Sequence, residues 1–314
     1  MSVAALMAVF LLADLEAFRG LASRAQWNRL PVIVLVILAT VVASAWRWRT
    51  LMLEALSMRR SLIVTALGLG GNYILPLRGG DALRIVLSAR GAQAPSVHAG
   101  ISAVAMEKVF DLIAAAAFGL ASTAAVVAPA TDESQTNVVA IALTILVVTT
   151  TALLTVRSGL TIRVFRFFAR TVRLSPRLYR HLLGPLHHLH ELAGPRRIAT
   201  LLLETAVIWL VLNVIAYLTI AQLVDVNLGV AEAMVLLFAG ALSLAIPAGP
   251  AGIGTFHAAI VAAFVLLGRP SSEGLVLAVA IHGMFFVGFC ASGIVALAIA
   301  SHDLGPLRLR GKTV

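Results

Sequence analysis

A break in the apolar segment of residues 61 to 90 carries residue types that bind anions. Proline removes a backbone donor and ends a helix, and two adjacent glycines allow a tight turn and close approach of a ligand. Asp81 is suited to cap a second helix over residues 82 to 89, whose positive N-terminal end would add to nearby guanidinium groups. This pattern predicts an anion site. A phosphate diester fits it because a guanidinium group forms bidentate hydrogen bonds to two phosphate oxygens. The predicted site residues here are Asn72, Pro76, Arg78, Gly79, Gly80, Asp81 and Arg84. In the alternative, Arg78 and Asp81 only pair and cap the turn.

A second charged cluster, Glu107, Lys108 and Asp111, lies in the middle of the apolar segment of residues 97 to 128. Left unpaired at the centre of a bilayer, the three charges would cost roughly 8–10 kcal/mol, at about 3 kcal/mol each. We therefore expect them to face the protein interior. Lys108 then neutralises one carboxylate, and the other is left to hold an arginine of the first break or to accept a proton during transport. A purely structural charge cluster is the alternative.

The apolar segment of residues 233 to 267 is broken in a similar way, by prolines and glycines. Thr255 is suited to cap the helix that follows, over residues 256 to 267. His257 is the only titratable group of this break, and His282 lies in the last apolar segment. Each histidine either binds a proton during transport or is simply hydrogen-bonded. We expect the charged ligand to bind mainly at the first break, with the second acting as a neutral wall or gate formed by Pro250, Gly252, Gly254, Thr255 and His257.

The composition excludes most soluble functions. Of 314 residues, 60% are hydrophobic and 12% are charged, and the mean hydropathy is +0.99, so the chain is expected to be an integral membrane protein. The formal charge of +10 is carried mainly by arginine, and in so apolar a chain it indicates lipid headgroups rather than nucleic acid. Cys290 is the only cysteine, so neither a disulfide framework nor a thiolate zinc site is expected. No cofactor or metal is predicted, because the histidines of residues 181 to 190 lack ligands at metal-binding spacing.

Charge and parity predict how the chain crosses the membrane. Hydropathy marks apolar segments at 1–22, 30–53, 61–90, 97–128, 137–157, 198–222, 233–267 and 274–300. The arginine-rich stretches 46–60 and 157–197 and the basic tail 301–314 should be cytoplasmic, and the acidic connections at 132–133 and 225–232 should be outside. Residue 60 is then inside and residue 132 outside, so the chain must cross the membrane an odd number of times between them. Two apolar segments, 61–90 and 97–128, lie in this stretch, and therefore one of them cannot cross.

The interrupted segment 61–90 is therefore predicted to be a re-entrant hairpin, and by analogy so is 233–267. The fold class that follows is an all-α polytopic membrane protein with inverted repeats, each of three spans and one broken-helix hairpin. The first repeat is residues 1–128. The second is 129–300, and it includes a cytoplasmic amphipathic segment at 158–197.

At this point the sequence resembles the membrane region of the lysylphosphatidylglycerol synthetase and flippase family. The resemblance lies in residues 46–49 (WRWR), 72–84 (NYILPLRGGDALR), 107–111 (EKVFD) and 247–257 (PAGPAGIGTFH). It implies lipid translocation without lipid synthesis, since the chain contains no counterpart of the family's soluble aminoacyl-transferring domain. Lys108 stands where the family often has arginine, and His257 where it commonly has glutamate, so a carboxylate role at 257 does not carry over.

The sequence thus predicts a lipid flippase or transporter, not an enzyme, in a bacterial inner membrane, with multiple spans. Its phospholipid headgroup, anionic or aminoacylated, would pass through a polar groove between the two hairpins. Proton coupling, if present, would use Glu107, Asp111, His257 or His282. Expected partners are membrane lipids, a second copy of the chain and a separate lipid-modifying enzyme, with no nucleic acid. Two alternatives stay open, a membrane-embedded lipid-phosphate transferase and a proton-coupled carrier of a small anion.

Overall fold

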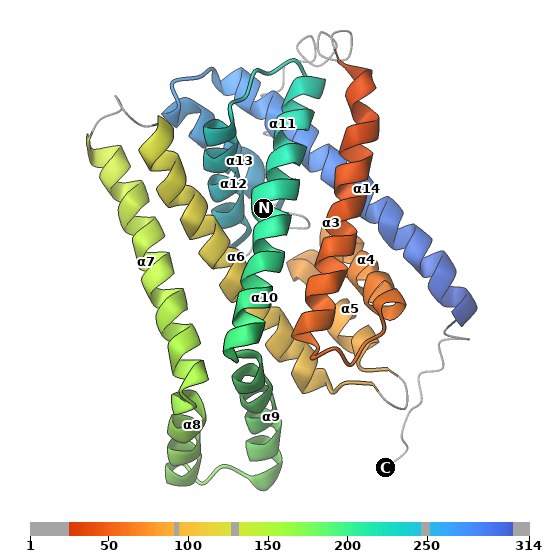
Figure 1. The fold of residues 1–314 in the computed structure, drawn as a ribbon, viewed down its shortest axis with the longest axis vertical. Coiled ribbons are helices and arrows are strands. Elements are labelled where there is room, and N and C mark those ends of the chain that lie inside the picture. Colours follow the sequence, from red (N-terminus) through yellow and green to blue (C-terminus); the bar gives the residue numbers. More distant parts are fainter. Residues whose placement is uncertain (1–24, 91–93, 127–131, 246–251, 304–314) are drawn as a thin grey trace.

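The computed structural model describes residues 25–90, 94–126, 132–245 and 252–303, and this part of the chain is helical without strands. Predictions for the first apolar segment, for Pro250 and for most of the basic tail lie outside the described residues. The helices are α3 (Leu30–Leu51), α4 (Met58–Ile74), α5 (Gly79–Ser88), α6 (Val97–Val126), α7 (Asp132–Arg157), α8 (Leu160–Thr171), α9 (Pro176–Leu192), α10 (Pro195–Ala206), α11 (Val214–Leu223), α12 (Val230–Ala245), α13 (Thr255–Leu266) and α14 (Ser271–Asp303). They form one elongated bundle (Figure 1).

Four stretches of helix within the described residues are long and apolar enough to cross a membrane: Trp27–Leu51, Val139–Arg157, Pro195–Leu223 and Ser271–Ala300. The third is continuous because a π-helical segment, η3 (Val207–Asn213), joins α10 to α11. α6 has 30 residues, or about 45 Å at 1.5 Å per residue, which is also enough to cross. The predicted all-α polytopic membrane fold is confirmed, while the inverted relation of its two halves stays a prediction.

The first predicted break is present between α4 and α5, which pack against each other as a helical hairpin. Leu77 and Arg78 both take left-handed backbone angles, with φ of 53° and 55°, and they reverse the chain just after Pro76. Gly80 is required for the close packing that follows, because a Cβ at this position would collide with the Gly68 carbonyl oxygen and the Asn72 nitrogen of α4.

The predicted capping role of Asp81 is wrong. Because the chain reverses at residues 77 and 78, α5 begins at Gly79, and Asp81 lies inside its first turn. The Asp81 N–H donates to Asn72 Oδ1 over 3.0 Å, and Asn72 Nδ2 donates back to Asp81 Oδ1 over 3.0 Å. This reciprocal pair joins α4 to α5 across the turn.

A second helical hairpin is formed by α12 and α13, which also pack against each other. Gly252 and Gly254 have positive φ, 67° and 94°, values that favour glycine. The predicted cap at Thr255 is wrong, because Thr255 is the first residue of α13 and its hydroxyl donates back to the Gly252 carbonyl over 3.1 Å. His257 Nδ1 instead accepts from the N–H of Gly254, the residue before the helix, over 3.4 Å.

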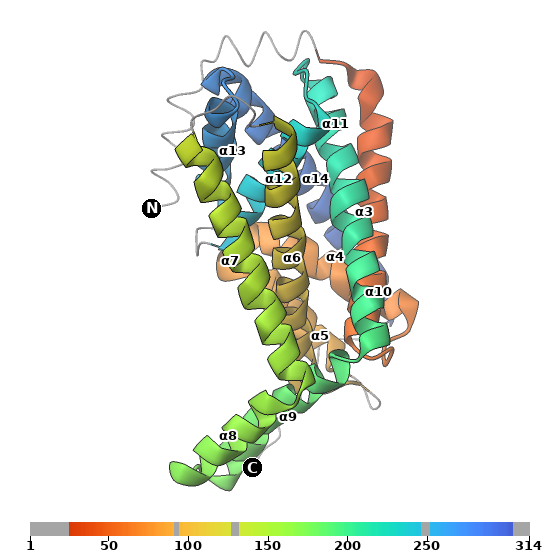
Figure 2. The same ribbon diagram turned by 60° about the vertical axis from the view of Figure 1, so that its left-hand side comes forward.

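The two ends of the bundle differ in charge, as the sequence predicts. The arginine-rich helices α8 and α9 pack on each other and project from one end (Figure 2). The connection from α11 to α12 lies at the opposite end (Figure 1). The charge asymmetry of the sequence therefore runs along the long axis of the bundle, and the side of the membrane on which each end lies stays a prediction.

Candidate functional site

A cavity of about 430 Å³ lies where the two helical hairpins meet the long helices. Seven of the predicted charged or polar site residues line it: Asn72, Arg78, Asp81, Arg84, Glu107, Lys108 and Asp111. Gly252 and His282 line it as well. Pro76, Gly79, Gly80, Gly254, Thr255 and His257 are not among the lining residues. The prolines and glycines of the first break therefore shape the turn and do not form the cavity wall.

The charged end of the cavity rests on buried ion pairs around Glu107. Its Oε2 accepts from Arg84 Nη2 over 2.6 Å, and its Oε1 accepts from Arg47 Nη2 over 2.9 Å. Arg47 also donates to Asp111 Oδ1 over 2.8 Å and to Thr205 Oγ1 over 3.2 Å. One carboxylate thus lies between two guanidinium groups, and each of those two side chains is 5% exposed or less.

Arg84 is held from a second direction by an aromatic ring. Its guanidinium carbon lies 3.9 Å from the centre of the Trp48 ring, a cation–π contact. Trp48 is itself fixed, because its Nε1 donates to Ser88 Oγ over 3.0 Å. Arg84 lines the predicted anion site, but Glu107 and Trp48 already engage it, so its role there is to support the site.

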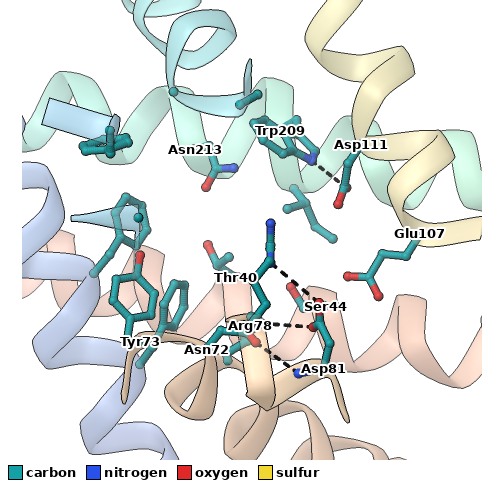
Figure 3. A pocket seen from close by; sticks show the side chains of 18 of the residues that line it. Thr40, Ser44, Asn72, Tyr73, Arg78, Asp81, Glu107, Asp111, Trp209 and Asn213 are labelled. Carbon is teal, nitrogen blue, oxygen red and sulfur yellow. Dashed lines mark hydrogen bonds and ion pairs between the residues drawn. The ribbon is translucent and has the colours of Figure 1, made fainter. Parts of the chain in front are cut away.

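A more accessible set of charged side chains lies next to the ion pairs of Glu107. Arg78 Nε and Lys108 Nζ each lie 3.7 Å from the same oxygen, Asp81 Oδ2, and Lys108 Nζ lies 3.8 Å from Asp111 Oδ2. The side chains of Arg78 and Lys108 are 43% and 35% exposed, the highest values among the ion-paired groups of this cluster. Arg78 extends into the middle of the cavity, with Glu107 on one side and Tyr73 on the other (Figure 3).

The lining carries a small excess of positive charge. Four cationic side chains, Arg47, Arg78, Arg84 and Lys108, face three carboxylates, those of Asp81, Glu107 and Asp111, which leaves one net positive charge. An anionic group is therefore the ligand that the charge of this end favours.

The other end of the cavity is aromatic. Six aromatic side chains line it: Tyr73, Trp209, Tyr217, Phe256, Phe285 and Phe289. Trp209 joins the two ends, because its Nε1 donates to Asp111 Oδ1 over 3.0 Å. Trp209 and Asn213 belong to the π-helical segment η3, and such segments often occur at functional sites. A molecule with a charged part and an apolar part matches this lining.

The sequence interpretation missed Arg47, which it assigned to a basic cytoplasmic linker of residues 46 to 60. The structure corrects this, because α3 continues to Leu51 and the Arg47 side chain is 5% exposed. A signal was present: Thr40, Ser44 and Arg47 recur at helical spacing in an otherwise apolar segment, and all three line the cavity. The contributions of Trp209, Asn213 and Tyr73 were also missed.

His257 and His282, which belong to separate apolar segments of the sequence, lie together. The His257 ring on α13 and the His282 ring on α14 are stacked, with centroids 5.0 Å apart and an interplanar angle of 25°. Within the described ranges no group of three or more His, Cys, Asp or Glu residues is placed to hold a metal ion.

One histidine outside the spans links the projecting helices to the bundle. His188 on α9 lies with Nε2 3.0 Å from the Leu51 carbonyl oxygen at the end of α3. Burial lowers the pKa of His188 below its ordinary value, although the bond to Leu51 acts in the opposite direction. The neutral imidazole is therefore the form favoured where α9 contacts α3.

The comparison with known families agrees with the resemblance seen in the sequence. No curated protein and no solved structure matches this chain significantly. The family model described as the lysylphosphatidylglycerol synthase TM region matches residues 1–293, most of the 314 residues. The chain therefore belongs to the lysylphosphatidylglycerol synthase transmembrane-region family.

Proposed function

We propose that this protein moves a lipid with an anionic headgroup between the two leaflets of a bacterial inner membrane. The observation that carries the proposal is the cavity whose charged end is joined to an aromatic end. Membership of a membrane-lipid family supports a lipid as the ligand. The headgroup occupies the charged end while the acyl chains stay in the bilayer.

Arg78 and Lys108 are the groups that bind the headgroup phosphate. Both lie 3.7 Å from Asp81 Oδ2, and they are the most exposed cations of the cluster. A phosphate oxygen that lies beside Asp81 and between the two cations would receive charge-assisted hydrogen bonds from both. Arg47 and Arg84, paired with Glu107, hold the charged end in shape.

Transport then requires the cavity to open alternately to each leaflet. The two helical hairpins lie on either side of the cavity, as in transporters whose broken helices meet at a central site. In this step one hairpin moves, together with its neighbouring helices, relative to the other hairpin. The movement closes the cavity to one leaflet and opens it to the other. The lipid leaves chemically unchanged, so the protein acts as a carrier and not as an enzyme.

Reconstitution in vesicles tests the proposal. We expect the protein to speed the exchange of fluorescent phosphatidylglycerol between leaflets, measured by its accessibility to an impermeant quencher. Arg78→Gln should slow this exchange at least about tenfold, the loss of roughly one charge-assisted hydrogen bond. Arg180→Gln, a change at an exposed arginine of α9 that bonds within its own helix, should leave it unchanged.

The same vesicles separate the alternatives. A transferase would alter the mass of the lipid instead of its leaflet, and mass spectrometry of the recovered lipids detects such a change. A carrier of small soluble anions would take up labelled glycerol phosphate from the medium. Either result, with no acceleration of lipid exchange, would replace the lipid-carrier proposal.

A further inference from the structure

One of the two stacked histidines lines the cavity, and neither takes part in the ion pairs of its charged end. His282 lines the cavity, and His257 packs behind it from α13. The His282 ring also makes edge contacts with Tyr73 and Phe256, at centroid distances of 5.7 Å in both cases. The pair therefore lies at the aromatic end of the cavity, in surroundings that disfavour a charge.

Hydrogen bonding indicates the tautomer of His257 in its neutral form. His257 Nδ1 accepts from the Gly254 N–H, so the proton of the neutral ring lies on Nε2. His282 Nε2 is buried and has no hydrogen-bond partner in the described part of the chain. A buried nitrogen without a partner is uncommon in folded proteins, and a ligand oxygen in the cavity is one group that would satisfy it.

No carboxylate forms an ion pair with either ring among the described residues. Among the described side chains of the elements packed against α13 and α14, the other titratable or charged groups are Arg47 and Arg49 on α3, Arg59, Arg60 and Tyr73 on α4, Tyr217 on α11, Glu232 on α12, and Glu273 and Cys290 on α14 itself. Of these, Tyr73 contacts the His282 ring, and Glu232 and Glu273 pair with Arg269. The described side chains thus provide the pair with no fixed counter-charge.

Two imidazolium ions 5.0 Å apart would repel strongly in these apolar surroundings, so the pair of neutral rings can take up at most one additional proton. The missing counter-charge would then come from an anion held by Arg78, which lies between Glu107 and Tyr73, because Tyr73 in turn contacts the His282 ring. We propose that the His257–His282 pair takes up one proton when an oxyanion occupies the cavity, so that anion binding is linked to proton binding. This inference rests on the proposed anion site and deepens it by naming the coupled ion.

The linkage has a direction that follows from charge. An anion in the cavity stabilises the protonated pair, and by reciprocity the protonated pair strengthens anion binding. Affinity for the anion should rise as pH falls, by up to about tenfold per pH unit for one linked proton. One proton also balances the single negative charge of a phosphate diester, so that the lipid and the proton cross together without net charge.

Calorimetry on the full chain in detergent tests the inference, with dihexanoyl phosphatidylglycerol as the probe. Titrations at pH 7 in buffers of different ionisation enthalpy give the number of protons taken up per probe bound. For the unaltered protein we expect uptake approaching one proton. His282→Gln and His257→Gln should bind the probe with that uptake lost. His181→Gln, a change at an exposed histidine of α9 bonded within its own helix, should retain it.

The outcomes distinguish failure of the histidine linkage from failure of the anion site. Probe binding by the unaltered protein without proton uptake overturns the histidine linkage and leaves the anion site standing. Absence of probe binding overturns the anion site and the linkage with it. Undiminished uptake in the double variant His257→Gln, His282→Gln would also overturn the linkage, because the proton would then be bound elsewhere. The measurement on the unaltered protein needs no variant to fold.

Discussion

Arg47 on α3 donates to Glu107 on α6 over 2.9 Å, although 60 residues separate them in the sequence. Glu107 holds Arg84 with its other oxygen, so α3, α5 and α6 meet at a single carboxylate. Charges buried in this way are costly unless each is paired, and here the pairs join the first helical hairpin to two long helices. The same ion pairs that line the cavity therefore also fix its shape.

Glu107→Gln should destabilise the protein strongly. The change leaves two buried guanidinium groups without their shared counter-charge, and breaking a buried pair in this way costs about 3–5 kcal/mol. The free energy of unfolding, from denaturant titration in detergent, measures the loss. Glu273→Gln is the matched control, because Glu273 pairs with Arg269 while 41% exposed, and its loss should cost about 1 kcal/mol or less. Equal losses for the two variants would contradict a structural role for Glu107.

Gly80→Ala should disturb the first helical hairpin. The added methyl group meets backbone atoms of α4 that have no space to move, and overpacking of this kind costs about 1–3 kcal/mol. Because the turn positions Arg78 and Asp81, lipid exchange in vesicles should fall as well. Gly283→Ala on α14 is the control, since a Cβ there meets nothing within 4 Å, and it should be neutral or stabilising by up to about 1 kcal/mol. A Gly80→Ala variant with unchanged stability and exchange would show that α4 and α5 do not need this close packing.

The sequence predicts the local features of the cavity well. Pro76 and Gly80 mark a break whatever the rest of the chain does, and three charges in an apolar segment must face inward because of their cost in lipid. Ion pairs between residues far apart in the sequence cannot be predicted in this way. Arg47 has the same local context as the basic residues of a cytoplasmic linker, and only the packing of α3 against α6 identifies its partner, Glu107.

The helix caps and the histidine pair also depend on tertiary structure that residue type does not predict. Asp81 and Thr255 are good capping residues by type, but the left-handed residues 77 and 78 and the glycine at 254 set where each helix begins. His257 and His282 come from different helices, and their stacking depends on how α13 packs on α14. Residue type predicts what a side chain is able to do, and tertiary packing decides which partner it meets.

Contact between α9 and α3 should weaken in acid. Burial lowers the pKa of His188, so the folded contact favours the neutral ring, and the unfolded ring titrates near pH 6.5. The unfolded segment then binds more protons, which means that the stabilisation is present above about pH 6.5 and is lost as the pH falls below it. Hydrogen exchange of the α9 amides, corrected for intrinsic rates, should show protection falling between pH 7.5 and pH 5.5. His188→Gln should remove this pH dependence, and a variant that keeps it would exclude His188 as its source.

Arg78 and Lys108 should contribute to anion binding as a unit. Each lies 3.7 Å from the same Asp81 oxygen, so one phosphate bound beside that oxygen would contact both. Loss of one charge-assisted hydrogen bond costs about 1.5–3 kcal/mol, so Arg78→Gln or Lys108→Gln should each weaken binding of dihexanoyl phosphatidylglycerol by about 10- to 150-fold. Groups that share a partner are coupled, and the double variant should therefore lose less than the two single losses combined. Arg269→Gln, which removes an arginine paired with Glu232 and Glu273 and outside the cavity lining, should bind normally. Strictly additive losses in calorimetry would mean that the two cations bind the probe at separate places and that the shared phosphate position is wrong.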